Sequence, residues 1–306
     1  MTDFAAACLY ALASLVGRLP SAWLRALAGM VARLWRALDA RESRVARRNL
    51  ELAYPALPPA ERAALHAAIL RNTAWQALET LRFWTRPRAV NLACIRAMHG
   101  VALFDAALAA GRGLIVAAPH YGNWELLNQW LASRTPLAIL YRPPESAVGE
   151  AFLRRVRADA GGGITQVRAE GPAVRQLFKL LQGGGVVGIL PDQQPKAGDG
   201  EFAPFFGVEA LTMTLLPRLA ARTGAPVLFA WCERIGDGDG FALHIEPAPA
   251  ALAADDPRAA VAALNAAVER IARRDPAQYQ WTYKRYTLRP SRRGEDNPYR
   301  AIERRR

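Results

Sequence analysis

The segment APHYGNWELLNQW carries the sharpest chemical signal in the sequence. His120 follows a short apolar run, Gly122 relaxes the backbone, and Asn123 is a good N-cap for the helix that follows. In one continuous helix, His120 and Glu125 would diverge by about 140°. The turn instead lets the imidazole fold back over the first helical turn, where Glu125 accepts from one ring nitrogen and leaves the other as a general base. Such a pair suits deprotonation of an alcohol that attacks an activated acyl group.

A structural role is the alternative for this segment. His120 would then be a strand-end histidine bonded to backbone, and Glu125 would only favour the helix dipole. The other histidines lack such a context and are expected on the surface or in the core; they are His66, His99 and His244. Neither these histidines nor the three scattered cysteines make a metal-ligand spacing, so the sequence predicts no metal site and a reducing compartment.

The elements that would position His120 are strands and helices that alternate from about residue 101 onward. Apolar runs bounded by Gly or Pro lie at 114–119, 136–141, 186–191 and 226–231, with a further alternating run at 241–246. Helix-period stretches lie at 123–133, 145–160, 171–182, 210–223 and 257–274. This order predicts an α/β fold with a mainly parallel central sheet flanked by helices. Sites in such sheets form beyond the carboxyl ends of strands, which is where His120 falls.

The N-terminal residues 1–40 predict a helical arm that associates with a membrane. An apolar stretch continues past residue 16, and the four arginines between residues 18 and 36 lie within about 80° of one another on a helix. Such a surface suits an interfacial helix, with a break at Pro20. The alternative is a soluble helical hairpin docked on the core. The first residues lack the basic side chain of a secretory signal. The uninterrupted apolar stretch, which ends at residue 16, is shorter than the about 20 residues that cross a bilayer. We expect an α/β domain over 41–290 and a basic tail over 291–306.

The charge of the chain indicates an anionic partner. Among its 306 residues, 40 Lys and Arg against 27 Asp and Glu give a net charge of +13. Nucleic acid, an acidic lipid surface and an acidic carrier protein would all suit this charge. We expect no nucleic acid, because the sequence has no RNA-binding aromatic block, zinc-finger spacing or convincing helix-turn-helix. A catalytically silent membrane adaptor is a further alternative.

Seven blocks of sequence, in order, resemble the bacterial acyltransferases that add secondary acyl chains to lipid A, within the lysophospholipid acyltransferase superfamily. They are RVARRNLELAYP, APHYGNWELL, YRPPE, RRVRADAGG, GGGVVGILPDQQP, PFFG and PAQYQWTYKRY. The resemblance covers nearly the whole chain. It implies that His120 is the general base and Glu125 its orienting acid.

The resemblance also implies residues that bind substrate. Arg157, with Arg155 as the alternative, matches the active-site arginine, and Asp192 matches the acidic residue of the third block. Arg142 is expected to hold a phosphate or the pantetheine arm, and Asn123 is grouped with these substrate-binding residues. An acyl chain needs an apolar groove, for which the candidates are Trp124, Leu127, Phe205 and Phe206.

The implied reaction moves a fatty acyl chain from acyl carrier protein to a hydroxyl of a lipid A precursor. Acyl carrier protein is then an acidic partner and co-substrate, and no other cofactor is expected. The remaining partners are an anionic membrane lipid surface and a phosphorylated glycolipid, at the cytoplasmic face of the inner membrane. Pro119, Tyr283 and Lys284 depart from residues common in the family, which leaves other acceptors open: a lysophospholipid, an ornithine lipid or a phosphatidylinositol mannoside. Acyl-CoA is the alternative donor.

Overall fold

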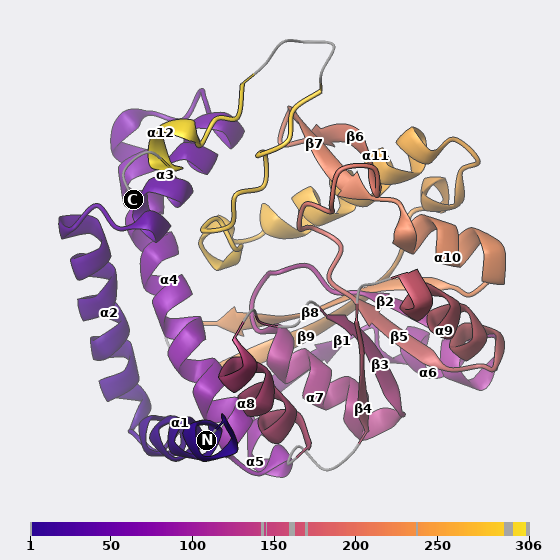
Figure 1. Ribbon diagram of the computed structural model, residues 1–306, viewed down its shortest axis with the longest axis horizontal. Coiled ribbons are helices and arrows are strands. Elements are labelled where there is room, and N and C mark those ends of the chain that lie inside the picture. Colours follow the sequence, from indigo (N-terminus) through magenta and orange to yellow (C-terminus); the bar gives the residue numbers. More distant parts are fainter. Residues whose placement is uncertain are drawn as a thin grey trace.

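A seven-stranded sheet forms the centre of the computed structural model, which describes residues 2–141, 144, 146–158, 163–168, 171–236, 238–290 and 296–303 (Figure 1). The strand order is β1-β9-β8-β2-β5-β3-β4. The strands are β1 (Ile95–His99), β2 (Leu114–Ala117), β3 (Leu137–Tyr141), β4 (Ile164–Arg168), β5 (Val186–Ile189), β8 (Val227–Ile235) and β9 (Gly240–Pro247). Neighbours are parallel except for β8 and β9. The predicted α/β fold with a mainly parallel sheet is therefore confirmed.

Alternate residues of β2 enter two different cores, one on each face of the sheet. Leu114 and Val116 share a core with α6 (Val101–Ala109) and α7 (Trp124–Arg134). Ile115 and Ala117 share the other core with α9 (Gly171–Gln182), α10 (Leu215–Thr223) and α11 (Pro257–Ala272). Because successive side chains of a strand point to opposite faces, burial on both faces explains why the central strands read as unbroken apolar runs.

One predicted helix is partly wrong. The stretch 210–223 begins as strand β7 (Val208–Met213), and α10 starts only at Leu215. Strand β7 pairs antiparallel with β6 (Gly200–Phe205) in a separate hairpin. Its two loop residues, Phe206 and Gly207, have φ of 50° and 75°, and positive φ at both positions is the backbone of a type I′ hairpin turn. The edge strands β1 and β4 were also not predicted, since they lie partly exposed and lack a long apolar run.

The N-terminal helices α1 (Thr2–Gly17) and α2 (Ser21–Ala37) pack on the long helix α4 (Pro59–Thr85), and α1 also contacts α8 (Ala147–Ala158). The chain breaks at Pro20, as predicted, and the two helices are bent by 111°. Among the described residues, no single helix has the length and apolarity to cross a bilayer, whereas α1 and α2 taken together pass that test.

Large apolar side chains remain exposed on the outer surface of this arm. They are Phe4, Leu9, Leu12, Leu15, Trp23, Met30, Leu34 and Leu38. The small side chains Ala28 and Ala32 are buried instead, on the opposite side of α2. The remaining helices are α3 (Arg41–Ala53), α5 (Arg88–Leu92) and α12 (Arg300–Glu303). Much of the basic tail lies outside the described residues, and the division at residues 40 and 290 stays a prediction.

Candidate active site

His120 and Asp192 occupy equivalent positions after neighbouring parallel strands. Ala117 of β2 is the register partner of Ile189 of β5. Two residues follow each strand, the second of them a proline, and the next residue is His120 after β2 and Asp192 after β5. Parallel strands end at the same edge of a sheet, so the equal offset brings the imidazole and the carboxylate together.

The Asp192 carboxylate holds His120 by both its ring and its backbone. Its Oδ1 lies 2.7 Å from His120 Nδ1, and its Oδ2 accepts from the backbone N–H of His120 at 2.9 Å. Side-chain exposure is 12% for His120 and 2% for Asp192. A carboxylate can only accept, so the proton of the neutral imidazole lies on Nδ1 and Nε2 keeps its lone pair. This is the tautomer that a general base needs.

The surroundings of Asp192 keep it ionised. Burial raises the pKa of this carboxyl, but the charge of His120 and the hydrogen bonds from the His120 ring and backbone more than offset it, so that the pKa lies below its usual range. Tyr279 lines the same pocket as Asp192. Burial raises the pKa of Tyr279 well above its ordinary value, and the neighbouring Asp192 charge raises it further. Tyr279 is therefore neutral beside a buried anion.

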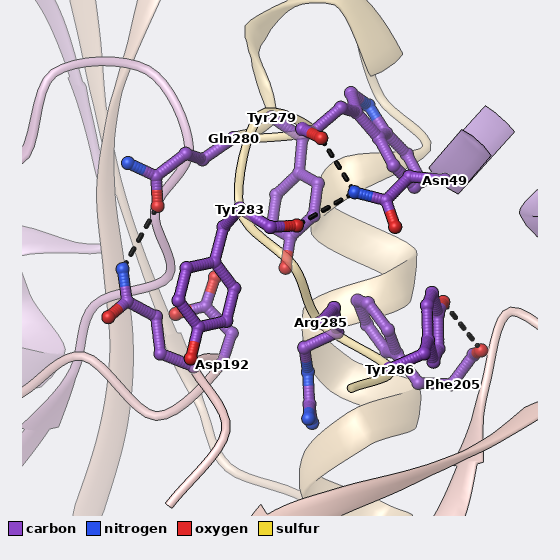
Figure 2. A pocket seen from close by; sticks show the side chains of 10 residues that line it. Asn49, Asp192, Phe205, Tyr279, Gln280, Tyr283, Arg285 and Tyr286 are labelled. Carbon is purple, nitrogen blue, oxygen red and sulfur yellow. Dashed lines mark hydrogen bonds between the residues drawn. The ribbon is translucent and has the colours of Figure 1, made fainter. Parts of the chain in front are cut away.

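The other ring nitrogen of His120 faces Gln193. The two Nε2 atoms lie 3.2 Å apart, and Gln193 Nε2 also donates to Gln280 Oε1 at 3.1 Å. The ring of Trp124 meets the imidazole edge-on, with 4.9 Å between ring centroids. Figure 2 shows the pocket that lies beside this group, with Asp192, Gln280 and Tyr283 among its lining residues. Nε2 of His120 therefore lies next to Gln193, a residue that lines this pocket at the carboxyl edge of the sheet.

Gly122 is required in the turn that follows His120. Its φ is +60°, and a Cβ at this position would lie 1.9 Å from the carbonyl oxygen of Cys232 in β8. The next residue, Asn123, donates its backbone N–H to the same oxygen at 2.8 Å. The turn is thus pressed against the backbone of β8, and only glycine allows this approach.

Asn123 makes the contacts of a helix cap rather than those of a substrate ligand. Its Oδ1 accepts from the backbone N–H of Leu126 at 3.0 Å, as the predicted N-cap requires. Its Nδ2 donates to Glu79 of α4 at 2.9 Å, and the residue is fully buried. Both polar ends of the side chain are used inside the protein. The expected substrate-binding role of Asn123 is therefore corrected to a structural one.

Glu79 in turn belongs to a buried ion pair that joins α4 to β8. Both oxygens of its carboxylate accept from Arg234, at 2.8 and 2.7 Å. The Arg234 guanidinium also lies 3.7 Å from the centroid of the Trp75 ring. Through Asn123, this pair connects the packing of α4 to the turn beside His120.

The carboxylate that contacts His120 Nδ1 is not that of Glu125, which the spacing in the sequence favoured. Glu125 lies in the first turn of α7 and is 6% exposed, but Asp192 makes the bond at Nδ1. At this nitrogen the structure therefore places Asp192, which the sequence analysis put among the substrate-binding residues, and not Glu125. The reason is the register of β2 and β5, which spacing within one segment cannot include. Whether Glu125 contributes to catalysis stays a prediction.

The predicted arginines are placed only in part. The Arg155 guanidinium lies 4.7 Å from the centroid of the Tyr10 ring in α1. Arg157 is in α8, but its side chain lies outside the described residues, as does the whole of Arg142. Their roles stay predictions. Of the groove candidates, Leu127, Phe205 and Phe206 are buried in the core, whereas Trp124 is half-buried beside His120.

A C-terminal segment supplies residues of the candidate site to which the sequence analysis assigned no role. Residues 276–288 cross the edge of the sheet where His120 lies. Gln280 donates its backbone N–H to the carbonyl of His120 at 3.0 Å, and Gln278 accepts from Gly122 at 3.2 Å. The Tyr283 hydroxyl accepts from the backbone N–H of Gln194 at 3.0 Å. The signal lay in the PDQQP and PAQYQWTYKRY sequences, which belong to the blocks that carry the family resemblance.

Comparison with known proteins gives a consistent picture. The family model described as bacterial lipid A biosynthesis acyltransferase matches residues 3–287. The chain is 29% identical over 266 residues to the lipid A biosynthesis palmitoleoyltransferase of Escherichia coli K12, covering 86% of this chain and 83% of that protein. It is 26% identical over 251 residues to the lauroyltransferase of the same organism, covering 82% and 80%.

One relative is named for a different acceptor and matches about half of the chain. The chain is 31% identical over 153 residues to a phosphatidylinositol mannoside acyltransferase of Mycobacterium tuberculosis H37Rv, covering 49% of this chain and 48% of that protein. The palmitoleoyltransferase and lauroyltransferase matches extend over most of the chain, as does the family model. The chain therefore belongs to the bacterial lipid A biosynthesis acyltransferase family.

Proposed function

We propose that this acyltransferase moves a fatty acyl chain from the thioester of an acyl carrier protein to a hydroxyl of a lipid A precursor. The observation that carries the proposal is the buried Asp192 carboxylate on Nδ1 of His120, which leaves Nε2 unprotonated next to Gln193, a residue that lines the pocket. Membership of the family supports the lipid A precursor as acceptor.

His120 would act as base and then as acid. Its Nε2 takes the hydroxyl proton while the alcohol oxygen attacks the thioester carbonyl, and Asp192 stabilises the imidazolium that forms. When the tetrahedral intermediate collapses, the C–S bond breaks and the leaving thiolate takes the proton back from Nε2. The products are the ester and the free thiol of the carrier, and the proposed reaction consumes no other cofactor. Glu125 is proposed to support the imidazolium from the neighbouring helical turn.

The charge of the chain supports anionic substrates. The net charge of +13 would steer an acidic carrier protein to the enzyme, and arginine suits the phosphates of the acceptor. We propose that Arg142 holds a phosphate or the pantetheine arm, and that Arg157, with Arg155 as the alternative, is the active-site arginine that binds substrate. Acyl-CoA stays the alternative donor, since it is also anionic. Nucleic acid is not a proposed partner.

We propose that the enzyme works on the cytoplasmic face of the inner membrane. The support is the arm formed by α1 and α2, whose large apolar side chains face outward next to arginines. Burying such side chains at the acyl boundary while the guanidinium groups meet lipid phosphates would hold the protein on an anionic surface. A phosphatidylinositol mannoside is the second candidate acceptor, because one relative is named for it.

The test is acyl transfer by the purified protein. Acylated carrier protein is offered with a lipid A precursor or with a phosphatidylinositol mannoside in mixed micelles, and products are identified by mass spectrometry. Positioned proton transfer is worth about 10²–10⁴-fold, so His120→Ala should lose that much of the rate. His99→Ala, at an exposed histidine, is the matched control and should keep wild-type activity. Equal product from the wild type and His120→Ala would contradict the proposal, and product with the mannoside alone would move the assignment to that acceptor.

A further inference from the structure

The backbone N–H groups of residues 120–123 are all engaged within the protein. His120 donates to Asp192 Oδ2 at 2.9 Å, and Tyr121 donates to the carbonyl of Pro119 at 2.7 Å. Gly122 donates to Gln278 and Asn123 to Cys232, at 3.2 and 2.8 Å. Attack on a thioester creates an oxyanion that needs hydrogen-bond donors about 2.7–3.1 Å away. These four amides are already paired, so the donor has to come from a side chain or from an amide of another segment.

The side-chain amide of Gln193 is the polar group already placed at the base nitrogen. Because His120 Nε2 carries a lone pair, the contact of 3.2 Å is a hydrogen bond donated by Gln193 Nε2. The second proton of the same amide nitrogen goes to Gln280 Oε1 at 3.1 Å. Gln193 thus directs one N–H at the place where an acceptor hydroxyl must bind, and Gln280 fixes the other.

Both glutamines are held against the catalytic segment. Gln280 donates its backbone N–H to the carbonyl of His120 at 3.0 Å. The residue after Gln193, Gln194, donates its backbone N–H to the Tyr283 hydroxyl at 3.0 Å and accepts at Oε1 from the backbone N–H of Leu288 at 2.8 Å. A donor fixed in this way costs little reorganisation when charge develops nearby, which is what makes a preorganised donor effective in catalysis.

We propose that Gln193 is a catalytic residue that donates to the oxyanion of the tetrahedral intermediate. This inference rests on the proposed acyl transfer. The acceptor hydroxyl displaces one Gln193 hydrogen bond from His120 Nε2, while the bond to Gln280 keeps the amide in place. The C–O bond then forms, the hydroxyl proton goes to Nε2, and the carbonyl π electrons move onto oxygen, where the freed N–H of Gln193 meets them. Collapse restores C=O, breaks the C–S bond and sends the proton to the thiolate.

The kinetic test compares variants at this position. Loss of one oxyanion donor costs about 10²–10³ in kcat, so Gln193→Ala should fall by that factor with little change in KM. Gln193→Glu keeps the shape but sets a carboxylate against the oxyanion, and it should be at least as slow. Gln182→Ala, an exposed glutamine at the end of α9, is the matched control and should match the wild type. A Gln193→Ala variant that keeps wild-type kcat, or that raises only KM, would overturn the proposal.

A spectroscopic test does not depend on turnover. In the protein without substrate, ¹⁵N NMR of the histidine rings should show His120 protonated on Nδ1, and the Nε2 signal should shift when Gln193 becomes Ala. An unchanged Nε2 signal would show that Gln193 does not contact the base, and would overturn the proposal whatever the activity. If the wild type gave no acyl transfer while the Nε2 signal shifted as expected, the proposed function would fail separately from this contact.

Discussion

The substitution Asp192→Asn tests the proposed catalytic pair most directly, because it removes the charge and replaces one accepting oxygen by a donating NH₂ group while keeping the shape. Asp192 accepts from His120 Nδ1 and from the His120 backbone N–H. An asparagine has only one oxygen for these two donors. If that oxygen stays on the ring, the NH₂ group meets the backbone N–H. If the amide turns over, the NH₂ group meets Nδ1, which then has to be the acceptor, and the ring proton moves to Nε2.

Each arrangement has a cost that can be estimated. A donor set against a donor in a buried site costs about 1–3 kcal/mol, and a hydrogen bond to a charged group contributes about 1.5–3 kcal/mol. At about 1.4 kcal/mol for each factor of ten, the lost stabilisation of the imidazolium alone slows the reaction by about 10–10²-fold. The turned-over amide removes the base tautomer as well, and in a serine protease triad the same change costs about 10⁴. We expect Asp192→Asn to lose about 10²–10⁴ in kcat.

The assay is acyl transfer under single-turnover conditions, with Glu125→Gln measured beside it. Circular dichroism and the thermal midpoint check that both variants fold. We expect the Asp192 variant to be the slower one, with KM for the donor little changed. If Asp192→Asn stayed within about threefold of the wild type while Glu125→Gln lost about 10² or more, Glu125 would be the orienting acid and our assignment from the strand register would be wrong.

The remaining predictions concern stability. Gly122→Ala should lower the thermal midpoint by several degrees, because left-handed backbone costs about 1–2 kcal/mol and the added Cβ meets the Cys232 carbonyl; an unchanged midpoint would contradict the role of this glycine. Glu79→Gln leaves the buried Arg234 charge unpaired and should cost about 3–5 kcal/mol in denaturant unfolding, part of which a Glu79→Leu, Arg234→Met double variant should restore. The pKa of Asp192 is lowered on folding, so its charge stabilises the protein above the unfolded value of about 3.9, and this contribution is lost as pH falls through the folded pKa. The stability difference between the wild type and Asp192→Asn should therefore be present at neutral pH and close in acid, as denaturation at several pH values would show.

The fold was predictable where a strand is buried on both faces. The runs that became β2, β3, β5 and β8 are continuous and apolar, and glycine or proline marks their ends. The edge strands β1 and β4 expose one side and give a weaker pattern. The β6–β7 hairpin was missed because its turn is Phe206-Gly207, which lacks the usual Asn-Gly or Asp-Gly signal.

The site was predictable at His120 but not at its partner. The His120 segment combines a strand end, a glycine and an N-cap within a few residues, so local reasoning finds it. Asp192 lies 72 residues away and meets His120 only because β2 and β5 are neighbours in register. Periodicity does not reveal which strands are neighbours. A shared local pattern was visible nonetheless. The apolar runs that became β2 and β5 both end in a proline, and the next residue is His120 or Asp192.

The position of segment 276–288 near the end of the chain determines when the candidate site can be completed during synthesis. It places Tyr279 beside the Asp192 carboxylate and contributes Gln280 to both His120 and Gln193. A nascent chain that has exposed β2 and β5 can already pair the histidine with the aspartate, but the far wall of the pocket is still inside the ribosome. We therefore expect acyl transfer only after this segment has left the ribosome and packed beside His120.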